Sequence, residues 1–326
     1  MKKVVISLFV ALLATVGVKA QQIAVVSESG TTSMYQTLPE AIEGADPGSV
    51  IYLPGGGFQI SDDVKITKKL TIIGIGHKAN GKNADGNTVI SDNLFFDGGS
   101  SGSSVMGCYI SGDVYIGNDG SSVNDVTVRY CNLNSVLVKK SSCTGTIINQ
   151  NYIRSESDFC GASVTITNNV FKALKSINGG DISYNVTCND RNEPTNSTKT
   201  LIYVNNVSIT HNIFRYGNEG LIHEGSNVQV SENFLEGGSW GDSPVLIDAG
   251  VDDIFENCNN WSISPSSNFH FKKDYKEYET KVGIYAGDGF SDSGMAPVPY
   301  ILAKKVDVQT DASGKLNVKI RVKAGE

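Results

Sequence analysis

Several features that are common in proteins are scarce in this 326-residue sequence, and each absence excludes a class of protein. Beyond the N-terminal segment, no apolar run reaches the ~18 residues that a membrane-spanning helix needs. The six cysteines include no CxxC pair, and they are too sparse for a scaffold built on disulfides. There are only four histidines, at positions 77, 211, 223 and 270, and no serine or cysteine nucleophile accompanies them in sequence. We therefore expect neither a membrane span, nor a cysteine-rich metal site, nor a nucleophilic triad.

The N-terminus and the charge balance indicate export. Lys2 and Lys3 precede a short apolar run, and small residues Val18 and Ala20 precede Gln21, which is typical of a signal peptide over residues 1–20. The full chain carries a net charge of −7, and losing the three lysines of residues 1–20 would give −10. Such an acidic chain favours neither nucleic acid nor an anionic membrane as partner. We expect a secreted, periplasmic or cell-surface protein.

A short phrase recurs along the sequence: VTITNNVF at 164–171, VSITHNIF at 207–214 and VQVSENFL at 228–235. Aligned on the residue before the final apolar pair, the phrase occurs seven times, about 21 residues apart on average. That position, here called the slot, holds Cys108, Cys131, Asn151, Asn169, Asn185, Asn212 and Asn233. A strand repeated at this interval predicts a solenoid with coils ~4.8 Å apart, and recurring Asn side chains predict an amide ladder along it. The prediction is an all-β right-handed parallel β-helix.

The N-terminal part of the mature chain supports the same fold. In the stretch from Ser33 to Gly76, Pro39 and Glu40 indicate the start of a short helix, and strands such as SVIYL and KLTIIGIG follow. This stretch resembles the opening of the pectin-lyase-like superfamily, the right-handed β-helices that include pectate lyases and polygalacturonases. The ending resembles that of uncharacterised secreted bacterial β-helix proteins. The resemblance implies a helical cap on a β-helix over residues 21–260.

Residues 261–326 form a C-terminal extension in which the repeat fades. Its last segment, KLNVKIRVK at 315–323, alternates apolar and basic residues and predicts a one-sided strand. We expect this extension to cap the last coil; a C-terminal export or attachment signal is the alternative.

The catalytic signatures of the superfamily are missing. The sequence has neither the Asn-Thr-Asp, Gly-His-Gly and Arg-Ile-Lys motifs of polygalacturonases nor the Trp-Ile-Asp-His-type motif of pectate lyases. Carboxylates that could bind Ca²⁺ occur at Asp242, Asp248, Asp252 and Asp253. Because they lie in loop-like sequence, we interpret them as turn residues and expect no metal and no cofactor.

Two groups of residues remain as site candidates. Three positions past the slot, Arg154, Lys172 and Arg215 are predicted to form an outward basic row that could pair with carboxylated or sulfated sugars. The segment around Arg215 adds binding candidates Tyr216 and Glu219, and Arg215, His223 and Glu224 are weak catalytic candidates. For each group, an ordinary solvated surface is the alternative.

Cys108 and Cys131 occupy the same slot on successive coils. Their Cα atoms should lie ~5 Å apart, which a disulfide tolerates, and two small buried thiols are the alternative.

Together these features predict an exported β-helix that engages complex, acidic polysaccharide without a recognisable catalytic motif. Two alternatives stay open: a polysaccharide lyase or glycoside hydrolase with non-standard residues, and a surface adhesin or structural protein.

Overall fold

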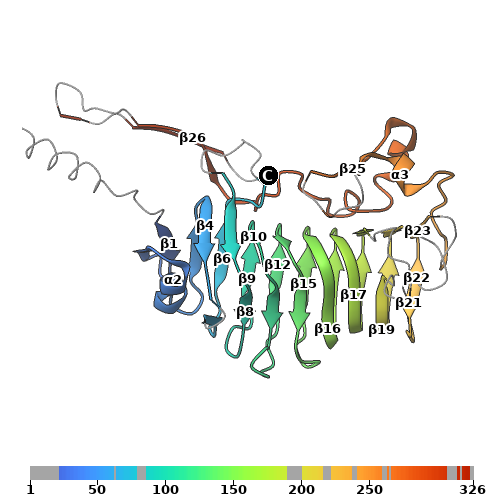
Figure 1. Ribbon diagram of the computed structural model, residues 1–326, viewed down its shortest axis with the longest axis horizontal. Helices are drawn as coiled ribbons and strands as arrows, with labels where there is room; N and C mark the ends of the chain where they lie inside the picture. Colours follow the sequence, from blue (N-terminus) through green and yellow to red (C-terminus); the bar gives the residue numbers. More distant parts are fainter. Residues whose placement is uncertain are drawn as a thin grey trace, which may run out of the picture.

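The computed structural model describes residues 22–61, 64–78, 86–188, 200–215, 222–236, 241–258, 263, 266–306, 314–315 and 318–323. In this part of the chain, 23 strands form one large sheet whose pairings are parallel from β3 onward, and two two-stranded sheets follow. Figure 1 shows the strands side by side along the long axis, from β4 near one end to β22 and β23 near the other. The predicted all-β class with a parallel sheet is confirmed. The segment 1–20 lies outside the described residues.

The large sheet consists of three runs of strands, and each coil contributes one strand or strand segment to each run. Run A comprises β3(Val50–Leu53), β6(Thr71–Gly74), β9(Ser104–Met106), β12(Thr127–Arg129), β15(Thr146–Asn149), the C-terminal parts of β16(Tyr152–Thr167), β17(Val170–Ser183) and β19(Leu201–Thr210), and β22(Gln229–Ser231). Run B comprises β4(Gly56–Gln59), β7(Thr88–Ser91), β10(Tyr109–Ile110), β13(Asn132–Leu133), the N-terminal parts of β16 and β17, β18(Val186–Thr187), β20(Ile213–Phe214) and β23(Phe234–Leu235). Run C comprises β5(Lys65–Ile66), β8(Leu94–Phe96), β11(Val114–Ile116), β14(Val136–Val138), the middle of β16 and β17, the start of β19, and β21(Ile222–His223).

One apolar residue per coil faces inward from run A. Aligned residues on successive strands stack in the core, and all but the last are fully or almost fully buried: Ile51, Ile72, Val105, Val128, Ile148, Ile166, Ile182, Ile209 and Val230. The stack explains the apolar position of the repeated phrase. Each coil is stable because its neighbours cover it on both sides.

The predicted asparagine ladder is confirmed. Each slot Asn accepts, through Oδ1, the backbone N–H of the slot residue one coil earlier, and where that residue is also Asn it accepts its Nδ2–H as well, at 2.8–3.1 Å. Its own Nδ2 donates to backbone carbonyls of its own coil and the preceding one, as Asn169 does to Thr167 O and Ile148 O. All five asparagines are fully buried. Buried amides with all their hydrogen bonds satisfied fix the register of the coils.

The N-terminal strands β1(Ile23–Val26) and β2(Thr32–Tyr35) pair antiparallel, and β1 also pairs with β3. Helix α2(Leu38–Gly44) follows. Its first turn has a capping box, in which Thr37 accepts from the Glu40 N–H and Glu40 accepts from the Thr37 N–H. Leu38, Ala41 and Ile42 are buried and belong to the main core, so this face of α2 packs against that core.

The chain after the last coil turns back. Helix α3(Val251–Ile254), strand β24(Phe255–Asn257), strand β25(Asn268–Phe271) and the 3-10 helix η2(Lys273–Tyr278) lead into residues 279–298, which we call the strap. Figure 1 shows this orange-to-red segment passing over the ends of the strands back toward the first coils.

The strap contacts one coil after another in reverse order. Its hydrogen bonds join Gly283 N–H to His211 O (2.9 Å), the Asn168 Nδ2 group to Ile284 O and Ala286 O (2.9 and 2.8 Å), Ser291 N–H to Gln150 Oε1 (2.8 Å) and His77 N–H to Gly294 O (3.0 Å). Beneath it lies the corner between runs A and B, where the residue before each slot has a positive φ: Gly107, Tyr130, Gln150, Asn168, Tyr184, His211 and Glu232. The left-handed conformation turns these side chains outward, and the strap covers most of them.

The described chain ends in a hairpin. Strands β26(Tyr300–Val306) and β27(Val318–Lys323) pair only with each other, antiparallel. Figure 1 shows β26 extending away from the coils.

Candidate functional site

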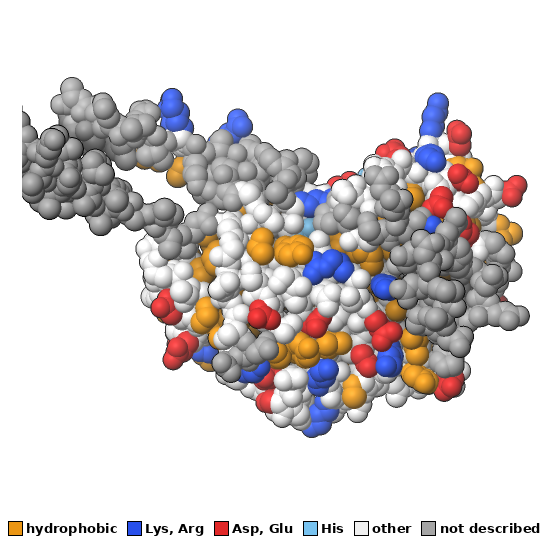
Figure 2. All heavy atoms as spheres, in the orientation of Figure 1, with side chains coloured by type: hydrophobic (Ala, Val, Ile, Leu, Met, Phe, Trp, Pro, Cys, Tyr) orange, Lys and Arg blue, Asp and Glu red, His pale blue; other side chains and the backbone are white. Residues whose placement is uncertain are grey.

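The predicted outward basic row does not form. Arg154 donates to Asn132 Oδ1 (2.8 Å) and to two backbone carbonyls, Ile110 O and Ser111 O, and its guanidinium lies 4.8 Å from the centre of the Tyr109 ring. Lys172 is exposed. On the face that Figure 2 shows, Lys and Arg side chains are interspersed with Asp and Glu.

Arg215 departs most from the prediction. Its side chain is 1% exposed and pairs with Asp252 of α3, with Nη2 3.2 Å from Oδ1. The segment that follows the last coil folds over this position and supplies the carboxylate. The prediction of an exposed Arg215 is therefore wrong, because a contact between residues far apart in sequence buries it.

The other candidates of this segment are not brought together in the described part of the chain. Tyr216 and Glu219 lie outside the described residues, as does the side chain of His223, whose backbone pairs with Ile202 in run C. Glu224 is exposed. Among the described residues, which include Asp242, Asp248, Asp252 and Asp253, no group of three or more His, Cys, Asp or Glu is placed to hold a metal ion.

Cys108 and Cys131 are two free, fully buried thiols, the second of the two predicted alternatives. Each thiol points to a backbone carbonyl of its own coil, Met106 O at 3.4 Å and Arg129 O at 3.1 Å. Burial raises the pKa of both thiols, that of Cys131 to about 12, so neither is a nucleophile at neutral pH.

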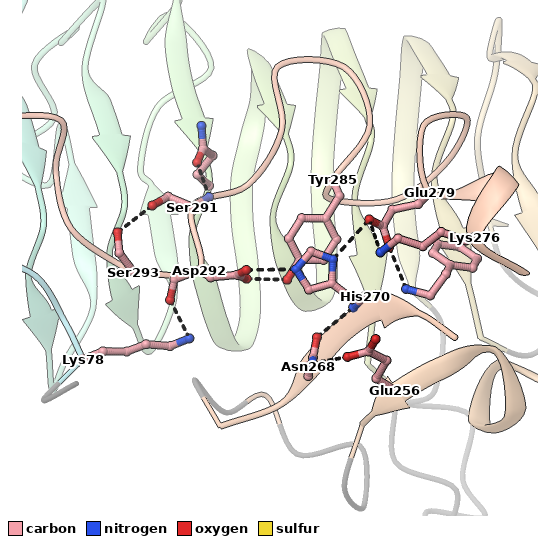
Figure 3. Close-up of polar contacts among 12 residues, drawn as sticks. Lys78, Glu256, Asn268, His270, Lys276, Glu279, Tyr285, Ser291, Asp292 and Ser293 are labelled. Atoms are coloured by element: carbon pink, nitrogen blue, oxygen red, sulfur yellow. Dashed lines mark hydrogen bonds and ion pairs between the residues drawn. The ribbon is translucent and has the colours of Figure 1, made fainter. Parts of the chain in front are cut away.

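The densest cluster of titratable groups lies on the segment from β25 to the strap, and Figure 3 shows it. The His270 ring places Nε2 at 2.9 Å from Asp292 Oδ2 and Nδ1 at 3.2 Å from Glu279 Oε1. Tyr285 stacks on this ring, with centroids 3.8 Å apart, and donates its hydroxyl to Asp292 Oδ1 at 2.5 Å. Lys276 pairs with Glu279 at 2.7 Å. Sequence analysis missed this cluster because its members are spread over 23 residues without a motif.

The cluster is saturated with internal contacts. Both His270 ring nitrogens lie against carboxylate oxygens of the protein, so neither nitrogen is open to a substrate. Burial and the hydrogen bond to Asp292 raise the pKa of Tyr285 well above its ordinary value, which keeps the phenol protonated. Burial alone would raise the pKa of Glu279, but hydrogen bonds from Lys276, Phe271 N–H and His270 hold it below its ordinary value. The group fastens the strap to β25 and η2 and does not have the free acid and base that catalysis requires.

The most regular exposed feature is the outer side of run A, which we call face A. Two outward rows flank the inward stack. The first row holds Val50, Thr71, Ser104, Thr127, Ile147, Thr165, Asp181, Ser208 and Gln229; the second holds Tyr52, Ile73, Met106, Arg129, Asn149, Thr167, Ser183, Thr210 and Ser231. Nine of these eighteen residues are Ser or Thr, one is acidic and one is basic. Face A is therefore rich in hydroxyls and almost uncharged on an acidic chain.

Part of face A is covered and part is open. Ala296 and Val298, at the end of the strap, pack with Ile73 and Met106 on the first strands. From β12 to β22, the hydroxyls of Thr127, Thr165, Ser208, Thr210 and Ser231 make no hydrogen bond with other described residues. The alternating Thr and Ser of the phrases VTIT and VSIT already signal this face, since residues two apart on a strand point to the same side.

Comparison with protein-family models, with curated proteins and with solved structures found no match for this chain. No helix in the described residues is long and apolar enough to cross a membrane.

Proposed function

We propose that this protein is an exported, non-catalytic β-solenoid that binds a polysaccharide along the open part of face A. The observation that carries the proposal is the array of outward hydroxyls from β12 to β22, five of which have no hydrogen-bond partner among the described residues. In the first row the hydroxyls lie on alternate strands, ~9.6 Å apart, and in the second row, from β16 to β22, they lie on successive strands, ~4.8 Å apart. A glycan is likewise a repeating array of hydroxyls, so it can form the same hydrogen bond at successive coils.

The energetics favour a long ligand. A single hydrogen bond exchanged with water contributes only ~1 kcal/mol, so one sugar held by two hydroxyls would bind weakly. Binding through several coils at once adds these contributions without repeating the entropic cost of association. The rigidity that the buried asparagine ladder gives to the coils means that face A needs no ordering when it binds.

Charge on face A bears on the kind of glycan. Its one guanidinium, Arg129, already donates Nε to Asn149 Oδ1 (3.0 Å), and its one carboxylate is Asp181. These opposite charges lie three strands apart in run A, on β12 and β17. We therefore propose a neutral or sparsely charged polysaccharide instead of the densely acidic one expected from the basic row.

We also propose that the fold is a right-handed β-helix and that the chain is exported. The repeated phrase and the parallel register support a right-handed β-helix related to the pectin-lyase-like superfamily, with α2 shielding the first coil. The pattern of residues 1–20 supports export. A lyase or hydrolase is less well supported, because the groups that could act as acid and base in the His270 cluster are engaged with one another.

The test is a panel of neutral, uronic and sulfated polysaccharides incubated with the mature protein, with and without Ca²⁺. Binding is followed by calorimetry, and turnover by unsaturated uronate absorbance and new reducing ends. We expect binding to a neutral glycan without products, weakened about tenfold or more when Thr127→Val and Thr165→Val remove two outward hydroxyls.

The matched control is Ser122→Ala, which removes an exposed turn hydroxyl that bonds to Ser142 (2.6 Å) away from face A. It should leave affinity unchanged. Product formation would contradict the non-catalytic proposal, and binding that the threonine variants do not alter would exclude face A as the site.

A further inference from the structure

We propose that the hairpin β26–β27 binds the surface of an anionic lipid bilayer, independently of the glycan-binding function. The first observation is an apolar row on β27 without a protein cover. Val318, Ile320 and Val322 are 49%, 58% and 59% exposed, whereas the inward apolar residues of the coils up to β19 are almost fully buried. Transfer of these three β-branched side chains from water to an apolar environment would be favourable, so the row is a candidate interaction surface.

The second observation is the charge of the same hairpin. By sequence, residues 300–323 hold two acidic residues, Asp307 and Asp311, and six basic ones, a net charge of +4: Lys304, Lys305, Lys315, Lys319, Arg321 and Lys323. The full chain carries −7, so the remainder of the sequence carries −11. The basic character of this one element is therefore opposite to that of the rest of the protein, and the net charge conceals it.

The pairing register concentrates this charge. Lys305 lies directly opposite Lys319, and Arg321 follows two residues along the same strand on the same side. No ion pair joins Lys305, Lys319 or Arg321 to a described acidic residue. Like charges placed directly across a strand pair are destabilising, and an anionic surface would remove that cost.

The third observation is the isolation of the hairpin. Its strands pair with no strand of the large sheet, and Figure 1 shows β26 leading away from the coils. Two strands alone are marginally stable in water and need a further layer to pack against. The partner must offer both an apolar region for the β27 row and negative charge for the lysines and arginine.

An anionic bilayer surface meets both requirements at once. β-branched side chains can enter the boundary between headgroups and acyl chains, while long Lys and Arg side chains stay at the anionic headgroups within a Debye length of ~8 Å. A second copy of this chain could cover the apolar row, but it would leave Lys319 and Arg321, which alternate with that row and point to the other face, without an anionic partner.

The experiment is sedimentation of the full chain with vesicles of phosphatidylglycerol and phosphatidylcholine, and with vesicles of phosphatidylcholine alone. We expect binding only to the anionic vesicles, falling as salt is raised. Lys319→Gln with Arg321→Gln should weaken it about 25-fold, from about fivefold per charge near the surface. Ile320→Ser with Val322→Ser should also weaken binding to the anionic vesicles, and the remaining binding should still fall as salt is raised.

The matched control is Lys139→Gln with Lys140→Gln, two adjacent exposed lysines of the coils, which should bind as the parent protein does. Circular dichroism would confirm that each variant folds. Three results would overturn the proposal: no binding to anionic vesicles, equal binding to phosphatidylcholine alone, or equal loss with the control variant. A dimer in sedimentation velocity that Ile320→Ser with Val322→Ser abolishes would instead assign the apolar row to a second copy.

Discussion

At the scale of single residues, the slot asparagines connect each coil to its neighbours by hydrogen bonds. The fully buried side chain of Asn169 takes part in five hydrogen bonds with its own coil and the two neighbouring coils, and its backbone N–H donates to Asn185 Oδ1. Replacing such a side chain leaves buried donors and acceptors on three coils without partners, each costing ~1–3 kcal/mol.

We therefore predict that Asn169→Ala lowers the free energy of unfolding by at least ~3 kcal/mol, measured by urea denaturation. Asn178→Ala is the control, because that exposed side chain only accepts one hydrogen bond from Asn206 at the surface. It should change stability by less than ~0.5 kcal/mol. Equal effects of the two substitutions would show that the ladder does not stabilise the coils.

His77 is a second residue with a measurable role. Its ring is buried under Gly294 of the strap and edge-on to Tyr152, and neither ring nitrogen has a hydrogen-bond partner in the described chain. Burial, with a smaller contribution from the adjacent Lys78, lowers the pKa of His77 to about 3. The folded protein therefore holds the neutral ring, while the unfolded chain takes up a proton near pH 6.5.

The sign of the pH dependence follows from this pKa. Between about pH 6.5 and pH 3 the unfolded state binds more protons, so stability falls as pH falls. We predict that between about pH 7 and pH 5 the parent protein loses about 2 kcal/mol more than His77→Leu. Denaturation at the two pH values measures the difference. The lowered pKa of Glu279 acts only at more acidic pH, where its contribution is lost as that carboxylate protonates. Parallel pH profiles would contradict the assignment.

Residue-level prediction from the sequence succeeded where the repeat itself carries the information. The slot, the inward apolar position and the Asn ladder all follow from aligning the repeated phrases of the sequence. The same period could not predict that Arg215 is buried, because Asp252 reaches it from a segment outside the repeat. Nor could it predict the left-handed residue before each slot, which is Tyr, Gln, Asn, His or Glu in different coils.

At the scale of elements, the strap is the feature that the sequence did not predict. In the five hydrogen bonds described above, the strap contributes a backbone carbonyl or amide, and such contacts leave no pattern of side chains to recognise in the strap sequence. The strands, by contrast, were predictable because alternation along a strand and repetition between strands both appear in the sequence. The glycines of the strap are the part of its sequence that still indicates close packing against the coils.

Gly294 is one such position. It has φ near +60°, and a Cβ there would lie 2.5 Å from His77 Nε2. We predict that Gly294→Ala detaches this end of the strap, so that the amides of His77 and Ser291 exchange hydrogen faster while the buried Asn151 amide stays protected. Gly120→Ala provides the control, because its φ of +83° imposes a similar backbone strain but no atom lies within 4 Å of the added Cβ. Unchanged exchange in Gly294→Ala would mean that the close packing over His77 does not hold the strap.

At the scale of the whole molecule, three surfaces have different chemistry. Face A is neutral and rich in hydroxyls, the corner between runs A and B is covered by the strap, and the terminal hairpin is basic. The sequence predicted a solenoid and a candidate binding site on a row of charged residues, whereas we propose that the site lies on the hydroxyls of face A. Charged residues are easier to notice in a sequence, whereas the pattern of Thr and Ser becomes a surface only when nine strands are aligned.

The central claim is that face A binds an extended glycan through repeated contacts. Its most direct test is calorimetric titration with oligosaccharides of increasing length, taken from a neutral polysaccharide that binds. The open part of face A, from β12 to β22, is roughly 25 Å long. We predict that affinity rises with each added sugar until the ligand spans this length and is constant beyond it. A constant affinity from two or three sugars upward would show a compact pocket and contradict the account.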